Sequence, residues 1–192
     1  FDADAVLDAA RTHDATLFFG VPTMYARLAS SGRVGELGAL RLSAELASLA
    51  ALIRVAPAQA LARAHALVAR GVVPDSDLGK IGSEPAMAAR MNSLGELLTR
   101  DTAAPAIVVG AISHAEIAVV APFGEASGLI ARAVEHLVLI SAGLDPYGVI
   151  VVEAGHAESG SAYSAGLSSY ADGSVEGVKG WLLRCAAAVA RG

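Results

Sequence analysis

The stretch running from His114 to Arg132, HAEIAVVAPFGEASGLIAR, constrains the fold of this chain more than any other. Its apolar residues recur at helical spacing, stop at Pro122 and resume near Ser127. Proline has no backbone N–H to donate within a helix, so we expect the first helix to end before it. The sequence therefore predicts a helix, a short loop and a second helix, with the two helices at residues 104–120 and 127–142. This break in the helical pattern is where we expect a functional site.

Alanine and leucine at helical spacing continue on both sides of this unit, from residue 43 to the end of the chain. Hydrophobic residues make up 54% and charged residues 17% of the sequence, which favours packed helices over disorder. Further helices are predicted at residues 43–55, 57–70, 84–99, 161–170 and 175–190. Ser43 is expected to cap the first of these, and residues 149–152 are expected to be extended. Helix 127–142 is apolar almost all round, which predicts that it lies at the centre of the bundle.

Residues 1–42 differ from the rest of the chain in their amino-acid pattern. They predict a helix over residues 2–14, a short strand over residues 16–19 and a second helix over residues 22–31, which together form an α-β-α leader. The composition changes abruptly at LRLS, residues 40–43. We interpret this change as a join between two unrelated sources, with a helical domain over residues 43–192.

Charge and cysteine content exclude several classes of function. With 14 basic and 19 acidic residues the net charge is -5, so we expect no nucleic-acid partner. The single Cys185 excludes an internal disulfide and a cysteine-cluster metal site. The sequence also lacks the closely spaced pair of histidines that would predict a zinc site. Four charged side chains among residues 1–12 exclude a signal peptide there. We expect a cytoplasmic protein that does not enter a membrane.

The letters of the loop, APFGEASGLIAR, resemble the signature motif of the Fic (Fic/Doc) family, His-Pro-Phe-x-(Asp/Glu)-Gly-Asn-Gly-Arg-x-x-Arg. Five positions match, at Pro122, Phe123, Glu125, Gly128 and Arg132. Four positions depart from it, because Ala121 replaces the His, Ala126 a Gly, Ser127 an Asn and Leu129 an Arg. The resemblance covers residues 111–145 closely and residues 43–192 loosely. It implies a mainly α, Fic-like helical bundle around a central helix-loop-helix.

The family resemblance also implies a chemistry, the transfer of AMP from ATP to a protein hydroxyl. Its motif His acts as the general base, and Ala121 cannot accept a proton. Glu125 stands where the family binds Mg²⁺ on the nucleotide phosphates. The residues implied to contact ATP are Phe123, Gly124, Glu125, Ser127, Gly128 and Arg132. The sequence therefore predicts a degenerate Fic-fold protein that has lost adenylyl transfer and requires no cofactor, with ATP and Mg²⁺ as weak ligands.

Other roles stay open for three of these positions. His114 lies seven residues before Ala121, which predicts one shared helical face, but about 10 Å of helical rise separates the two positions, too far for direct proton transfer. The alternative for His114 is a buried side chain that hydrogen-bonds to the loop backbone. The alternative role of Glu125 is a solvated carboxylate that caps the next helix. The alternative role of Arg132 is an ion pair with Glu135, three residues further along the helix.

Residues 1–42 resemble a fragment of acyl-CoA synthetases of the adenylate-forming superfamily, especially malonyl-CoA synthetases, through the phrase ATLFFGVPTMYARL. That chemistry needs a Ser/Thr/Gly-rich phosphate loop and a C-terminal Lys domain, which the sequence lacks. Three other functions therefore stand beside the degenerate Fic hypothesis. They are an active Fic-type nucleotidyltransferase with an unorthodox base, a protein-interaction module that docks on a partner, and the remnant of an acyl-CoA ligase.

Overall fold

The computed structural model describes residues 8, 12 and 34–192, and within this part the chain is helical and contains no strand. The predicted leader elements, 2–14, 16–19 and 22–31, lie outside the described residues apart from residues 8 and 12. The α-helices of the described part are α3 (Val34–Ala44), α4 (Leu46–Ile53), α5 (Pro57–Ala69), α6 (Pro85–Thr99), α7 (Ala106–Val120), α8 (Ser127–Ser141), α9 (Val152–Ala157), α10 (Ser161–Ala171) and α11 (Val175–Arg191). The expected mainly α class is confirmed.

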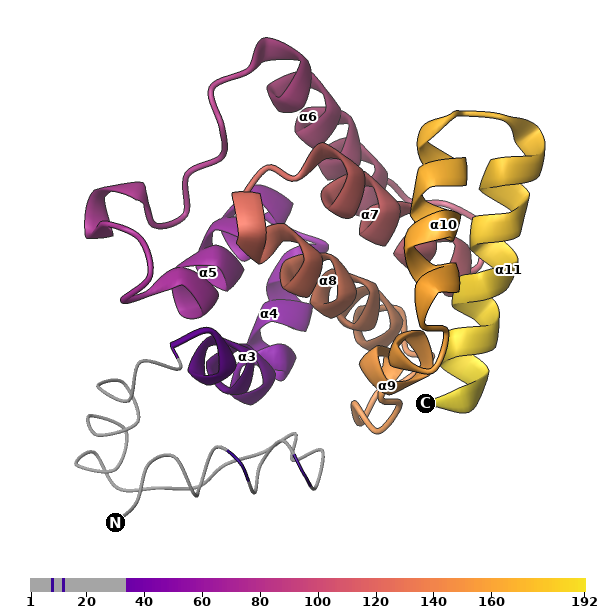
Figure 1. The fold of residues 1–192 in the computed structure, drawn as a ribbon, viewed down its shortest axis with the longest axis horizontal. Helices are drawn as coiled ribbons and strands as arrows, with labels where there is room; N and C mark the ends of the chain where they lie inside the picture. Colours follow the sequence, from indigo (N-terminus) through magenta and orange to yellow (C-terminus); the bar gives the residue numbers. More distant parts are fainter. Residues whose placement is uncertain (1–7, 9–11, 13–33) are drawn as a thin grey trace.

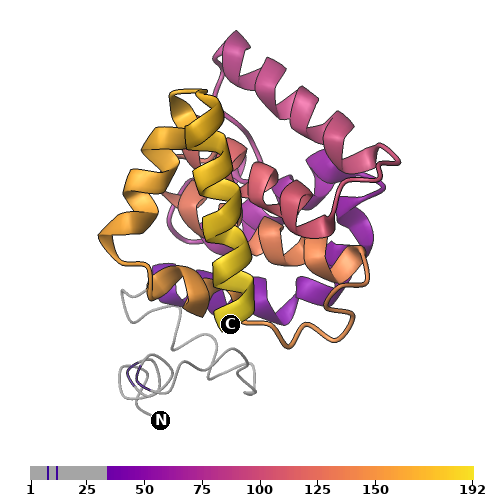
Figure 2. The same cartoon turned by 90° about the vertical axis from the view of Figure 1, so that its right-hand side faces the viewer.

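Helix α8 lies at the centre of the bundle, as its apolar sequence predicted (Figure 1). It packs against α7 along its length and also contacts α3, α4 and α5. The α10–α11 hairpin covers α7 from another side (Figure 2). The main apolar core forms where α4, α5, α6, α7 and α8 meet. Two packed groups of helices thus enclose the α7–α8 pair from different sides.

Prolines and a serine set several helix starts. Pro57 and Pro85 occupy the first positions of α5 and α6, where a missing N–H costs nothing. Ser174 caps α11, and its Oγ accepts a hydrogen bond 3.1 Å long from the backbone N–H of Gly177. These local signals explain why the predicted starts of α5, α6 and α11 agree with the structure to within one residue.

Two local predictions were wrong. Ser43 does not cap a helix, because α3 runs through it to Ala44 and a new helix, α4, begins at Leu46. Val152 does not belong to an extended segment, because it begins the short helix α9. Residues 149–151 are neither helix nor strand. The loop before α9 is held by the Asp145 carboxylate, which accepts hydrogen bonds from the backbone N–H groups of residues 149 and 150, at 2.9 and 3.0 Å.

The predicted boundary between residues 42 and 43 falls inside α3. Leu42 is buried in the same core as the helices that follow. Gly38 lies against α5, where a Cβ would stand 2.5 Å from the carbonyl oxygen of Val68. Only glycine allows the two backbones to approach so closely. Residues 38–42 therefore pack as part of the helical unit.

Among residues 34–192 no helix combines the length and the apolar character needed to cross a bilayer. Charged residues at the surface form ion pairs such as Arg63–Glu45 and Arg90–Glu116. Exposed pairs of this kind contribute little to stability, about 0 to 1 kcal/mol each. The buried contacts between helices are the main source of stability.

Candidate functional site

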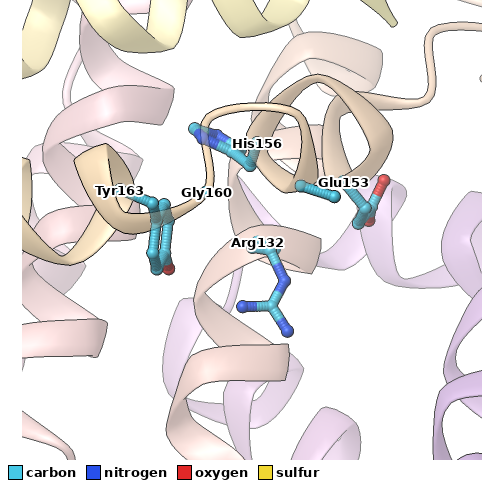
Figure 3. Close-up of a pocket in the computed structure, with 6 residues that line it drawn as sticks. Arg132, Glu153, His156, Gly160 and Tyr163 are labelled. Carbon is cyan, nitrogen blue, oxygen red and sulfur yellow. The ribbon is translucent and has the colours of Figure 1, made fainter.

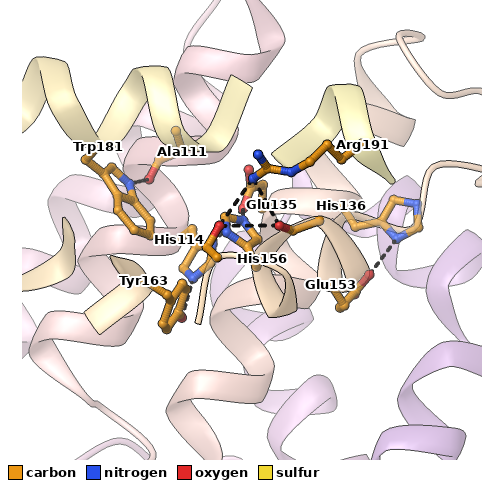
Figure 4. A network of polar contacts seen from close by, with 11 residues as sticks. Ala111, His114, Glu135, His136, Glu153, His156, Tyr163, Trp181 and Arg191 are labelled. Carbon is orange, nitrogen blue, oxygen red and sulfur yellow. Dashed lines mark hydrogen bonds and ion pairs between the residues drawn. The ribbon is translucent and has the colours of Figure 1, made fainter. Parts of the chain in front are cut away.

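A cluster of buried polar side chains lies where four helices meet (Figure 4). Each helix contributes one side chain, and the four are His114 from α7, Glu135 from α8, His156 from α9 and Cys185 from α11. Their polar side-chain atoms all lie within 4.8 Å of one another, and all four residues are buried. Buried groups of this kind are rare unless they are paired. We call these four residues the polar cluster.

Glu135 is the hub of the cluster. Its Oε2 accepts a hydrogen bond from His114 Nδ1 at 2.6 Å and another from His156 Nε2 at 2.7 Å. Because Nδ1 of His114 donates to the carboxylate, the neutral ring accepts at Nε2, where the Tyr163 hydroxyl donates at 2.8 Å. A Tyr–His–Glu chain of hydrogen bonds thus crosses three helices.

The charge of this network follows from its burial. Burial lowers the pKa of His114, more than the neighbouring Glu135 carboxylate raises it, so the imidazole is neutral. Burial alone raises the pKa of Glu135, yet the hydrogen bonds from His114 and His156 outweigh it and lower that pKa. Burial, reinforced by the negative charge of Glu135, raises the pKa of the Cys185 thiol. The cluster therefore holds one carboxylate charge and a protonated thiol.

Aromatic rings enclose the two histidines. The Trp181 ring stands edge-on to His114, with centroids 5.0 Å apart, and stacks on His156 at 6.0 Å. Its indole N–H donates to the carbonyl oxygen of Ala111 at 2.7 Å, which fixes the ring on α7. These contacts hold both imidazole planes in place.

A close approach of two backbones brings His156 into the cluster. Gly155 lies against α11, where a Cβ would stand 2.1 Å from the carbonyl oxygen of Ala188. Only a residue without a Cβ lets α9 lie so near α11. The glycine therefore positions its neighbour, His156, beside Glu135.

A cavity of about 400 Å³ opens beside the cluster (Figure 3). Its lining residues are Arg132, Glu153, His156, Ala157, Gly160 and Tyr163. Burial raises the pKa of Tyr163, although the positive charge of Arg132 beside its hydroxyl opposes this. Among residues 34–192 no acidic side chain forms an ion pair with Arg132. The cavity thus contains a cation that forms no salt bridge within the part of the chain that the structure describes.

The loop between α7 and α8 differs from the polar cluster in the contacts that hold it in place. Helix α7 ends at Val120, and Ala121 adopts the left-handed conformation, with φ of 50°. The Phe123 ring is buried and lies 4.7 Å from the His65 ring, measured between centroids. The backbone N–H of Phe123 donates to Ser127 Oγ at 2.9 Å. Packing and backbone hydrogen bonds hold this loop in place.

The predicted site residues therefore separate into groups. Phe123 and Ser127 are buried in the packing of the loop, whereas Gly124 and Glu125 are exposed in the short 3₁₀ turn Gly124–Ala126. Gly128 lies in the first turn of α8. The guanidinium of Arg132 reaches back toward it, with Nη1 3.8 Å from the point where a Cβ at position 128 would stand. Of the predicted nucleotide contacts, only Arg132 lines the cavity.

Two expectations about single residues were wrong. His114 does not hydrogen-bond to the loop backbone, since both its nitrogens bind side chains of the cluster. Ala121, in the left-handed conformation, is exposed, whereas His114 is buried. Arg132 does not pair with Glu135, whose carboxylate points inward to the histidines.

The sequence reasoning missed Glu135, His156, Tyr163 and the role of Cys185. One signal was available, because Glu135 interrupts a helix that is otherwise apolar almost all round. A carboxylate on such a helix must find a buried partner. Which partner it finds depends on contacts between distant helices, and spacing within one helix does not encode them.

No protein-family model, curated protein or solved structure matches this chain. Its function therefore has to be argued from the geometry. The cavity offers a cation, a phenol and an imidazole to a small ligand. The cluster behind it offers four side chains of the types that bind transition metals.

Proposed function

We propose that this chain is a degenerate Fic-like helical domain that binds a phosphate-bearing ligand at Arg132 and does not transfer AMP. The observation that carries the proposal is the Arg132 guanidinium, which faces a cavity and has no ion-pair partner among residues 34–192. A half-buried cation without an ion-pair partner in the described part of the chain favours an anion. Arginine in particular presents a planar fork of donors that matches phosphate oxygens.

The cavity supports a small ligand. Its volume of about 400 Å³ falls within the range of about 300 to 1,000 Å³ typical of small-molecule sites. The Tyr163 hydroxyl can hydrogen-bond to a polar ligand near the phosphate, while Glu153 disfavours a second negative group beside it. A nucleotide or another compound with one phosphate at its end fits this arrangement.

The absence of transfer rests on the lack of a base. Ala121 occupies the motif position and has no proton acceptor in its side chain. The nearest candidate along α7, His114, is fully buried, and hydrogen bonds occupy both of its ring nitrogens. Glu125 is an exposed carboxylate that can bind Mg²⁺. No general base stands at the motif position to deprotonate a hydroxyl that would attack the nucleotide.

Titration calorimetry with ATP, with and without Mg²⁺, and with inorganic phosphate tests this function. We expect binding by the wild type at millimolar ligand and a loss of at least about tenfold in affinity, equal to about 1.4 kcal/mol, for Arg132→Gln. Arg63→Gln is the matched control, because Arg63 pairs with Glu45 on the surface. Absence of any binding, or equal affinity in the two variants, contradicts the proposal. Incorporation of labelled AMP into a protein contradicts the absence of transfer.

A second candidate function, docking on a protein partner, is favoured by the loop between α8 and α9. Three apolar side chains are exposed there within six residues, with Tyr147 89%, Val149 71% and Leu144 49% exposed. Exposed apolar groups gathered in one place often mark interaction sites. Cross-linking in the source cell should capture a defined partner with the wild type and lose it with Tyr147→Ser combined with Val149→Ser. Equal capture by both proteins contradicts this role.

A further inference from the structure

The carboxylate of the polar cluster has one buried oxygen without a hydrogen-bond partner. In the described part of the chain this atom is Oε1 of Glu135, whose other oxygen, Oε2, contacts both histidines. Native proteins rarely leave buried polar atoms unpaired, and such atoms often mark an ion or another group that is not shown. The thiol of Cys185 lies beside the same carboxylate.

The chemistry of the four side chains is specific. Imidazole, thiolate and carboxylate are the ligands of zinc in proteins, with bonds of about 2.0 to 2.3 Å. The four ligand atoms lie within 4.8 Å of one another, a spacing at which one ion can reach all of them after small shifts. They come from four separate helices, so sequence motifs for zinc could not have shown them.

We propose that His114, Glu135, His156 and Cys185 bind one zinc ion at the junction of α7, α8, α9 and α11. The ion takes the place of the two protons through which the histidines now contact Glu135 Oε2, and each imidazole keeps its proton on its other ring nitrogen, Nε2 of His114 and Nδ1 of His156. The thiol proton leaves to solvent as the thiolate binds. One carboxylate and one thiolate then balance the two positive charges of the ion, which a dry site requires.

The surroundings of the cluster fit a metal site. With the ion on Nδ1, the neutral His114 carries its proton on Nε2 and donates it to the Tyr163 oxygen, which is 2.8 Å away. Such a contact orients a metal-bound imidazole. Trp181 packs on both histidine rings and shields the site. His156 and Tyr163 also line the cavity, which provides a route of entry.

Four protein ligands leave no coordination position for substrate, so this zinc ion is structural. It ties the short helix α9 and the C-terminal helix α11 to the central pair, α7 and α8. Metal binding to such a site contributes directly to folding stability. Removal of the ion is expected to loosen α9 first, because this helix has only six residues.

Cobalt is a visible probe for this site. The metal-free full chain, prepared by dialysis against a chelator, is titrated with Co²⁺ and followed by absorption. We expect one equivalent to bind, with the visible bands of tetrahedral cobalt and a thiolate charge-transfer band in the near ultraviolet. Cys185→Ser should lose the charge-transfer band. His136→Gln, outside the cluster, should keep it.

A second measurement does not depend on a variant that folds. Since the chain has one cysteine, a thiol reagent reports on Cys185 in the wild type alone. Zinc should slow that reaction at least tenfold, and a chelator should restore it. Folded wild type that binds no cobalt, or binds it without a charge-transfer band, overturns the proposal. Equal thiol reactivity with and without zinc overturns it as well.

Discussion

The loop between α7 and α8 and the polar cluster at the other side of the same helix pair differ in almost every respect. The loop carries the letters that resemble a catalytic motif, but its buried members, Phe123 and Ser127, serve packing. The cluster carries no sequence motif, but it brings four chemically active side chains within 4.8 Å. Residues that resemble a motif and residues that form a buried polar cluster thus lie in different parts of the same helix pair.

The largest expected difference between the two regions concerns their carboxylates. Glu135→Ala removes the acceptor of two buried imidazoles, and we expect a loss of about 3 to 5 kcal/mol in unfolding free energy. Glu125→Ala is the matched control in the loop, with an expected change within about 0.5 kcal/mol. Urea unfolding of both variants measures this. Equal losses would remove the distinction between the two regions.

A smaller effect is expected from the glycine that positions His156. Gly155→Ala places a Cβ against the Ala188 carbonyl, so α9 must move away from α11, at a cost of about 1 to 3 kcal/mol. Gly180→Ala, on the open side of α11, should instead stabilise the protein by about 0.5 to 1 kcal/mol. Thermal unfolding of both variants tests whether Gly155→Ala lowers and Gly180→Ala raises the stability of the protein. A stable Gly155→Ala protein contradicts the close packing of the two helices.

Acid should weaken the cluster and leave the loop unaffected. The folded state lowers the pKa of His114 below its usual 6.5, so stability falls as the pH drops through 6.5 toward the folded value. The pKa of Glu135 also lies below its usual 4.5, so its share is complete above 4.5 and is lost at lower pH. Each group contributes a slope of at most about 1.4 kcal/mol per pH unit. Urea midpoints against pH should show this slope, and His114→Gln should flatten its upper part.

The smallest effect concerns the loop backbone. Ala121 has φ of 50°, a conformation that glycine adopts without steric cost. Ala121→Gly should therefore stabilise the protein by about 0.5 to 1 kcal/mol. Chemical denaturation measures the change. A destabilised variant would mean that the methyl group makes a contact that outweighs the backbone strain.

Much of the helical frame could be predicted from the sequence, and little of the cluster. Pro57, Pro85 and Pro122 mark helix starts and one helix end through local backbone chemistry. The break between α3 and α4 has no such marker, so one helix was predicted from residue 43. The hydrogen bonds of Glu135 join residues 21 positions apart, through helices whose packing no local pattern specifies. Arg132 was predicted to contact a nucleotide together with the loop residues, and the structure places it on the wall of the cavity.

Chemical-shift mapping tests most directly whether ligand binding belongs to the cavity and not to the loop. The backbone amides of the isotope-labelled protein are followed while inorganic phosphate, and then ATP, is added. We predict the largest shifts at Arg132, Glu153, Gly160 and Tyr163, with small changes over residues 121–127. Largest shifts at residues 121–127, or no shifts at millimolar ligand, would contradict the account.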